Sequence, residues 1–315
     1  MGKYIIKKLI RLIITLIITS FVIFLIFELV PGDPVLDKLG TRATPELVES
    51  LRIQYGLNQP FIVRYLKFVG GIFTLDFGKS YTYGVSVFSL LKEKLVINFF
   101  LSLLALFFVV VISFPLGIYV AKHTGGISDK IISPLNQASM SIPSFVLGLL
   151  ITFFFGIVLR WFKPGGYVSY NANFGKFLYF LIFPAFALAI PKIAMCIRLL
   201  KGNILEEATK DYALTAYARG NNTTGLLYRH VLKNAMIPVI TFLGMALADM
   251  VAGSIVVEQV FSIPGISRIL LTSISNRDYP VVEAIIMGIA IIVIVLNLLV
   301  DIIYRIIDPR IRIDD

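Results

Sequence analysis

The stretch VINFFLSLLALFFVVVISFPLGIYVA, Val96–Ala121, decides the fold class of this chain. It is apolar almost throughout, and it exceeds the roughly 20 residues that a helix needs to cross about 30 Å of hydrocarbon. Its residues do not alternate in polarity, as the strands of a membrane β-barrel do. The stretch therefore predicts a helix that spans a membrane.

The same pattern recurs along the chain. Of the 315 residues, 57% are hydrophobic and 15% are charged, and the mean hydropathy is +0.87. A soluble domain of this length has nowhere to bury so much apolar surface. We expect an all-α integral membrane protein with six transmembrane helices: Leu9–Val30, Val96–Ala121, Pro134–Val158, Phe177–Ile197, Ile237–Val260 and Val281–Ile303. Pro184 and Pro191 should kink the fourth, because each removes a backbone donor.

The formal net charge is +10, and basic residues gather at the ends of the predicted spans. Basic residues beside short loops face the cytoplasm, so a basic start and a basic end place both termini there. The segment between spans four and five is cytoplasmic for the same reason. The residues at the ends are Lys3, Lys7, Lys8, Arg11, Arg305, Arg310 and Arg312. No basic run is interleaved with aromatics on a polar surface, so lipid headgroups rather than nucleic acid are the expected partner.

The chain divides into three regions by its pattern. Residues 1–95 hold the first span and an extracytoplasmic segment, residues 96–308 hold five spans, and residues 309–315 form a cytoplasmic tail. Within the outer segment, TPELVESLRIQYGL predicts a helix with Thr44 as its N-cap and Pro45 at its first position.

Few residues indicate covalent chemistry. The one cysteine, Cys196, forms no internal disulfide, and His123 and His230 lie far apart in sequence, so neither a disulfide nor a side-chain metal site is expected. Lys192 and Asp249 fall deepest in predicted spans. Charges at membrane depth are costly and often functional, so these two residues predict either a polar pathway or an interhelical ion pair.

The polar segment YARGNNTTGLLYRHVLKNAMIPV, Tyr217–Val239, lies between two very apolar segments. We expect two short helices here. The first runs over Leu205–Arg219, with a stripe of Leu205, Ala208, Tyr212 and Ala216, and stops at Gly220. Thr223 or Thr224 caps the second, which runs to Met236.

The second helix is amphipathic. Its apolar face holds Leu227, Tyr228, Val231, Leu232 and Ala235, and its other face holds Arg229, His230, Lys233 and Asn234, with Leu226 among them. Such a helix can lie on a lipid surface. Leu226 is an apolar side chain surrounded by hydrogen-bond donors, and such an arrangement suits a groove on a protein better than water. The sequence therefore predicts that this helix docks against a cytoplasmic partner. His230 has a second interpretation, as a buried histidine bonded to backbone carbonyls.

DYALTAYARGNNTTGLLYRHVLKNAMIPV resembles the cytoplasmic signature loop of binding-protein-dependent ABC importer permeases, and the peptide and nickel branch in particular. The branch pattern is D-Y-x-x-T-A-x-A-x-G followed by R-H-x-L-x-N-A-x-x-P. The matching residues are Asp211, Tyr212, Thr215, Ala216, Ala218, Gly220, Arg229, His230, Leu232, Asn234, Ala235 and Pro238.

The resemblance extends along nearly the whole chain. VPGDP, ATPELVESLRIQYGLNQP, LDFGKS, VVVEQVFSIPGISRILLTSISNRDYPVV and NLLVDIIYRIIDPRIR occur in the order of the family's motifs. The chain departs from the usual residues at Leu75, Asn221, Asn222, Ile263 and Ser267.

The resemblance implies a type I ABC importer permease fold in a prokaryotic inner membrane. It also implies a second homologous permease, two ABC ATPase subunits and an extracytoplasmic binding protein as partners. No cofactor is expected on this chain, because ATP and Mg²⁺ would be bound by the ATPase subunits, and the chain is expected not to be an enzyme. Di- or oligopeptides, nickel and metal chelates are the implied substrates.

The implied ATPase-coupling element covers about residues 203–236. Its expected contact residues are Asp211, Tyr212, Thr215, Ala216, Gly220, Leu226, Arg229, His230 and Asn234. The fifth span is expected to line the path, with Lys192 of the fourth span beside Gly244, Ala248, Asp249 and Gly253. The small residues have a plainer interpretation as packing contacts.

Two other classes of function fit the bare pattern. An ion-coupled secondary transporter would use Lys192 and Asp249 for coupling and would have no ATPase partner. A membrane-anchored assembly or signalling subunit would have no substrate path, and its deletion would leave transport unchanged.

Overall fold

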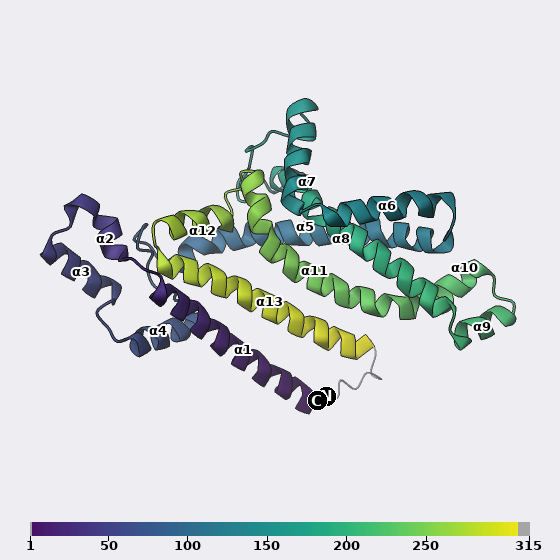
Figure 1. The fold of residues 1–315 in the computed structure, drawn as a ribbon, viewed down its shortest axis with the longest axis horizontal. Helices are drawn as coiled ribbons and strands as arrows, with labels where there is room; N and C mark the ends of the chain where they lie inside the picture. Colours follow the sequence, from purple (N-terminus) through teal and green to yellow (C-terminus); the bar gives the residue numbers. More distant parts are fainter. Residues whose placement is uncertain (1, 308–315) are drawn as a thin grey trace. The chain divides into compact units, whose positions relative to one another are not determined.

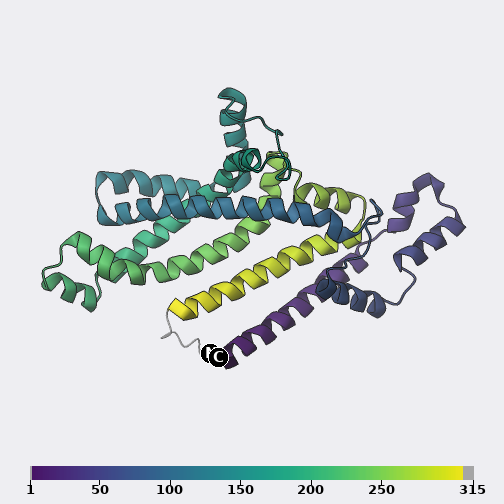
Figure 2. The same cartoon turned by 180° about the vertical axis from the view of Figure 1, so that it is seen from behind.

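The computed structural model describes residues 2–307, with the side chains of residues 6–303 (Figures 1 and 2). Helices dominate, and the described residues contain no β-strand, only an isolated bridge between Lys79 and Ser86. The predicted tail, residues 309–315, lies outside this range, as do Arg310, Arg312 and the side chains of Lys3 and Arg305. The expectation of an all-α membrane protein is confirmed.

Five helices of the described chain are long and apolar enough to cross a membrane. They are α1 (Gly2–Leu29), α5 (Val87–Lys122), α8 (Phe174–Ala208), α11 (Leu232–Val260) and α13 (Tyr279–Ile307). Helices α5, α8, α11 and α13 each contain one predicted span and extend beyond it, and α1 covers the first predicted span except Val30. Helix α8 runs without interruption through Pro184 and Pro191, because neighbouring groups can satisfy the carbonyls that a proline leaves free in a membrane helix.

The predicted span Pro134–Val158 is not one straight helix. The chain forms α6 (Ile127–Ser141), α7 (Ser144–Ile151) and the π-helical segment η2 (Thr152–Val158), and it turns by 103° between α6 and α7. Ile142 is extended at the break, with φ −92° and ψ 122°. It precedes Pro143, whose ring disfavours the helical conformation for the residue before it. Counted as one broken span, this pair brings the number to six.

The helices gather into two compact units, and α5 and α13 each contribute to both. The first unit comprises residues 1–98 and 264–295, and the second comprises residues 99–263 and 296–315. The division into regions 1–95, 96–308 and 309–315 stays a prediction.

The first unit contains residues 31–86, between α1 and α5. Its further elements are α2 (Pro34–Leu39), η1 (Gly40–Arg42), α3 (Pro45–Tyr55), α4 (Phe61–Thr74) and α12 (Ile266–Ser275). Helix α3 begins as predicted, with the Thr44 hydroxyl accepting from the Leu47 amide at 3.4 Å. In the hydrophobic core of the first unit, the start of α5 packs against α12 and α13. The buried side chains of this core are Val87, Leu91, Ile266, Val281, Ala284 and Ile285.

The VPGDP motif forms a turn against Arg277 in this unit. Gly32 has φ +127°, and a Cβ atom there would lie 0.9 Å from the Arg277 guanidinium. That guanidinium donates to the Pro31 carbonyl at 2.7 Å and pairs with Asp37 at 2.7 Å. Asp33 then caps α2 by accepting from the Val35 amide at 2.8 Å. Glycine is favoured here because residues with a side chain rarely adopt this φ.

The LDFGKS loop is held by one buried carboxylate. Asp278 has no exposed surface, and it accepts from the Ser80 hydroxyl and from the amides of Tyr81 at 2.8 Å and Thr82 at 3.1 Å. The motifs LDFGKS and NRDYP therefore meet in space although about 200 residues separate them in sequence.

The second unit is built around α8. Helices α6, α7 and α11 each pack along it, and Figures 1 and 2 show α8 and α11 side by side. The short helices α9 (Asp211–Ala218) and α10 (Thr223–Leu226) and the π-helical segment η3 (Leu227–Val231) connect the end of α8 to α11.

Replacing Asp278 by Asn should destabilise the first unit. The amide group would face three donors with a single acceptor oxygen, and each unpaired buried donor carries a desolvation penalty. We expect the free energy of unfolding to fall by about 2 kcal/mol, measured as a lower thermal unfolding midpoint in mild detergent. The exposed Glu46→Gln is the matched control, and an unchanged midpoint for Asp278→Asn would contradict this account.

Candidate functional site

The segment between α8 and α11 differs from the two predicted helices and their cap. The first predicted helix, Leu205–Arg219, is divided: α8 continues through Ala208, and α9 begins at Asp211. The helical periodicity restarts at this break. Of the predicted stripe, only Ala216 is buried, with Ala213 beside it, whereas Leu205 and Tyr212 are exposed.

The stop at Gly220 is present. Gly220 has φ +89°, a conformation that side-chain-bearing residues rarely adopt, and its amide donates to the Tyr217 carbonyl at 2.9 Å. The next helix is capped by the Asn222 side chain, which accepts from the Gly225 amide at 2.7 Å. The prediction of Thr223 or Thr224 as the cap was wrong. Asparagine has a carbonyl oxygen of suitable reach at the N-cap position.

The second predicted helix does not end before Pro238. It runs through η3 into α11, so Thr223–Val260 is one membrane-spanning helical stretch of 38 residues. Within the predicted apolar face, Leu227, Val231 and Ala235 are buried, whereas Tyr228 is 56% exposed. The wider π turn rotates the side chains relative to an α-helix, which accounts for the exposure of Tyr228 beside the buried Leu227.

The segment is tied to both neighbouring spans. Glu207, near the end of α8, pairs with Lys210 and accepts from the Tyr212 hydroxyl. The Asn234 side chain, at the start of α11, interacts with both Glu207 and Tyr212. Asn203 of α8 donates to the Ala235 carbonyl at 3.2 Å. The hairpin of α9, α10 and η3 is therefore held at each end.

The contacts of Tyr212 affect its acidity. Burial raises the pKa of the Tyr212 hydroxyl, and its hydrogen bond to the Glu207 carboxylate raises that pKa further. The hydroxyl therefore stays protonated as a donor at neutral pH.

The expected contact residues differ in exposure. Asp211, Thr215 and Arg229 are exposed, whereas Leu226, His230 and Asn234 are half-buried. The Thr215 hydroxyl donates to the Asp211 carbonyl at 2.8 Å. The His230 ring makes no hydrogen bond to another described residue, so the geometry gives no support to the alternative of a histidine bonded to backbone carbonyls.

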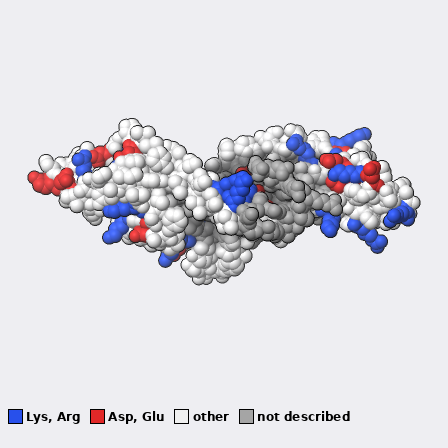
Figure 3. Space-filling view, turned by 90° about the horizontal axis from the view of Figure 1, so that it is seen from below, with Lys and Arg blue, Asp and Glu red and all other residues white. Residues whose placement is uncertain are grey.

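Two exposed apolar side chains were missed by the sequence analysis. Leu214 is 56% exposed and Tyr217 is 61% exposed, and both lie on α9. Their spacing of three places them on one helix face, a signal that was hidden because the helix was read from Leu205 rather than from Asp211. Figure 3 shows charged side chains gathered over the end of the second unit that carries α9 and α10. A small apolar face among charges can dock against a protein groove.

Lys192 and Asp249 form the interhelical ion pair that was one of the two predictions for them. The Lys192 ammonium lies 2.7 Å from the Asp249 carboxylate and joins α8 to α11. The Lys192 side chain is 21% exposed and the Asp249 side chain 66% exposed. The pair therefore has one enclosed partner and one open partner.

The small residues of α11 fall into two kinds. A Cβ atom on Gly244 would lie 1.9 Å from Val300 of α13, whereas Gly253 has no neighbour within 4 Å of such an atom. Ala248 is buried. Close helix approach therefore accounts for Gly244 and does not account for Gly253.

Comparison with known proteins identifies the family. The family described as "Binding-protein-dependent transport system inner membrane component" matches residues 113–313, and its N-terminal companion matches residues 1–102. The "Probable peptide ABC transporter permease protein y4tP" of Sinorhizobium fredii is 36% identical over 312 residues, which cover 99% of this chain and 100% of that protein.

Two further relatives are similar over their whole length. The "Oligopeptide transport system permease protein AppB" of Bacillus subtilis is 35% identical over 99% of this chain and 100% of that protein. The "Glutathione transport system permease protein GsiC" of Escherichia coli is 32% identical over 99% of each. With the apolar helices described above, these matches show that the chain belongs to the binding-protein-dependent transport system inner membrane components and is a multi-pass permease subunit of an ABC importer.

Proposed function

We propose that this permease imports short peptides. The observation that carries the proposal is the similarity over 99% of the chain to permeases described as peptide, oligopeptide and glutathione transport proteins. Short peptides are the chemistry that these substrates share. Nickel and metal chelates are the competing cargo, and uptake measurements separate the two classes.

The chain acts with partners in this proposal. A second, homologous permease completes the translocation path, an extracytoplasmic binding protein delivers the cargo, and two ABC ATPase subunits bind ATP and Mg²⁺. This chain binds no cofactor of its own and catalyses no reaction. Its N- and C-termini and the 203–236 segment face the cytoplasm, where the ATPases are.

The segment from α9 to η3 is the coupling element of the proposal. Its exposed Leu214 and Tyr217 are suited to an apolar groove of an ATPase subunit. The contacts of Glu207, Lys210 and Tyr212 attach α9 to α8, and the stretch Thr223–Val260 continues directly into a span. A displacement of the docked hairpin is then passed to two spans as rigid-body motion.

A pull-down from the native membrane in mild detergent tests the proposal. The tagged chain should recover a second permease and one or two ATPases. The pair of substitutions Leu214→Ser and Tyr217→Ser should reduce ATPase recovery at least tenfold while the second permease remains, because both side chains are exposed and contribute little to folding. The exposed Leu47→Ser of α3 is the control. Recovery of the chain alone would refute the proposed assembly.

Gly220→Pro should uncouple ATP use from uptake without unfolding the chain. Proline fixes φ near −65° and has no amide hydrogen, whereas Gly220 has φ +89° and donates to the Tyr217 carbonyl. We expect expression to stay normal and ATP-driven uptake of labelled dialanine into vesicles of the assembled complex to fall at least tenfold. Gly202→Ala, within α8 and with no neighbour at its Cβ position, is the control. Normal uptake by Gly220→Pro would contradict the coupling role.

Lys192 and Asp249 are proposed to form part of a polar path. A purely structural ion pair would tolerate joint neutralisation, because no unpaired charge remains. Residues of a polar path would not tolerate joint neutralisation, and uptake would fall. We expect dialanine uptake by the double variant Lys192→Met with Asp249→Asn to stay several-fold below that of the unaltered chain. Uptake restored in the double variant, relative to each single variant, would assign the pair to stability alone. Uptake that collapses with an ionophore and persists without ATP would favour an ion-coupled carrier.

A further inference from the structure

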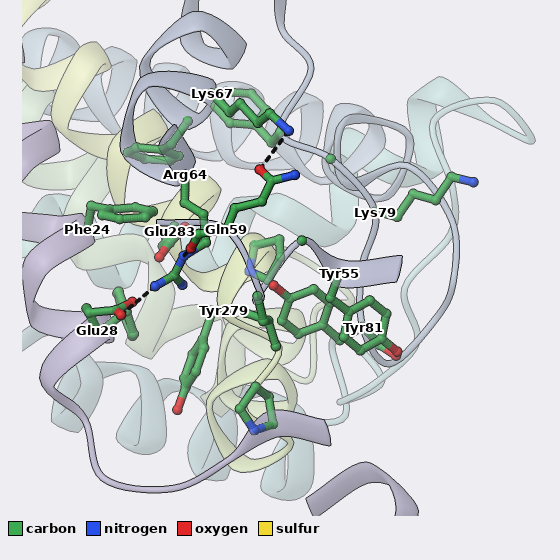
Figure 4. A pocket seen from close by; sticks show the side chains of 18 of the residues that line it. Phe24, Glu28, Tyr55, Gln59, Arg64, Lys67, Lys79, Tyr81, Tyr279 and Glu283 are labelled. Atoms are coloured by element: carbon green, nitrogen blue, oxygen red, sulfur yellow. Dashed lines mark hydrogen bonds and ion pairs between the residues drawn. The ribbon is translucent and has the colours of Figure 1, made fainter. Parts of the chain in front are cut away.

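The first unit contains a cavity that the transport cycle described above does not use. Its volume is ≈1180 Å³, and it is lined by α1, α3, α4, the 76–81 loop and the start of α13. Figure 4 shows its labelled side chains. Cavities of this order hold small organic molecules rather than single ions.

Four of the charged side chains around the cavity form two ion pairs. Arg64 of α4 forms an ion pair with Glu28 of α1, and Arg52 forms one with Asp33. Lys67 donates to the side-chain oxygen of Gln59 at 2.8 Å. These contacts leave no carboxylate partner for Lys67 within the described chain.

Among the carboxylates that line the cavity, only Glu283 is buried. It lies one turn into α13 and is only 9% exposed, yet it makes no hydrogen bond and no ion pair with another described residue. Its side chain lines the cavity close to Arg64 (Figure 4). One guanidinium thus faces two carboxylates, Glu28 and Glu283, and the group of three carries a net charge of −1 when all are ionised.

The charge of the buried Glu283 carboxylate needs compensation. Removing a carboxylate from water without a partner is strongly unfavourable, so the site takes up either a proton or a cation. The described residues contain no group of three or more side chains that could hold a metal ion. Aromatic rings surround the cavity instead, with Tyr55 and Tyr81 stacked at 4.1 Å. Ring faces attract organic ammonium groups.

We propose that this cavity binds the primary ammonium group of a small zwitterion, with Glu283 as its counter-ion. Lys67 and Lys79, which also line the cavity, provide charges for the anionic end of the same molecule. Two sources carry this chemistry: the amino terminus of a short peptide and the headgroup of phosphatidylethanolamine. The proposal stands on the cavity alone and does not rest on the transported substrate.

The full chain in nanodiscs tests the peptide source. Equilibrium dialysis compares dialanine with N-acetyl-dialanine, which has nearly the same size but no ammonium group. Dialanine should bind at least tenfold more tightly than its acetylated form. Glu283→Gln, which keeps the shape of the side chain, should remove that preference. Glu93→Gln, an exposed carboxylate of α5 outside the cavity, should keep it.

Native mass spectrometry of the same variants tests the lipid source. Nanodiscs with equal amounts of phosphatidylethanolamine and phosphatidylglycerol supply a headgroup with the ammonium and one without it. Preferential retention of phosphatidylethanolamine, lost in Glu283→Gln, identifies the lipid, and a dialanine preference identifies the peptide.

The absence of both preferences in the unaltered chain overturns the proposal and leaves a protonated Glu283. Because that comparison uses the unaltered chain, it remains decisive if Glu283→Gln fails to fold. ATP-driven uptake of dialanine by the assembled complex is measured separately. If only that uptake is absent, the proposed import of peptides is contradicted and the proposed ammonium site is not.

Discussion

The hydrogen-bonding demand of the backbone governs this structure. In hydrocarbon no water is present to pair with an amide or a carbonyl, so each spanning segment must satisfy its own groups as a helix. The long apolar helices α1, α5, α8, α11 and α13 follow from this demand. Irregular backbone then occurs where buried polar side chains can support it. Asp278 shows this, since a single carboxylate pairs with two amides and a hydroxyl of the 80–82 loop.

The sequence predicted the features that depend on composition or on one local signal. Long apolar runs are unambiguous because so few structures can hold them, and Thr44 with Pro45 predicted the start of α3 because capping depends on adjacent residues. The family, too, could be predicted from motifs in their order. The comparisons confirm it over the whole chain.

The features that depend on distant contacts could not be predicted. The break between Ala208 and Asp211 interrupts a regular pattern and places Glu207 against Lys210 and Tyr212. The π turn of η3 adds a rotation that a fixed 100° per residue does not contain. The charges of the cavity in the first unit are another case, because Glu28, Arg64 and Glu283 come from three helices. Nothing in the spacing of those residues indicates that they meet.

The 38-residue stretch Thr223–Val260 has a mechanical consequence. At 1.5 Å per residue it is about 57 Å long, and its N-terminal end is an extension of the span rather than a separate loop. A tilt of roughly 5° about one end would move the other by about 5 Å, close to one helical turn. A small rotation on one side of the membrane is thereby enlarged into a displacement on the other, and the π turn of η3 and Pro238 are the points along the stretch at which it can bend.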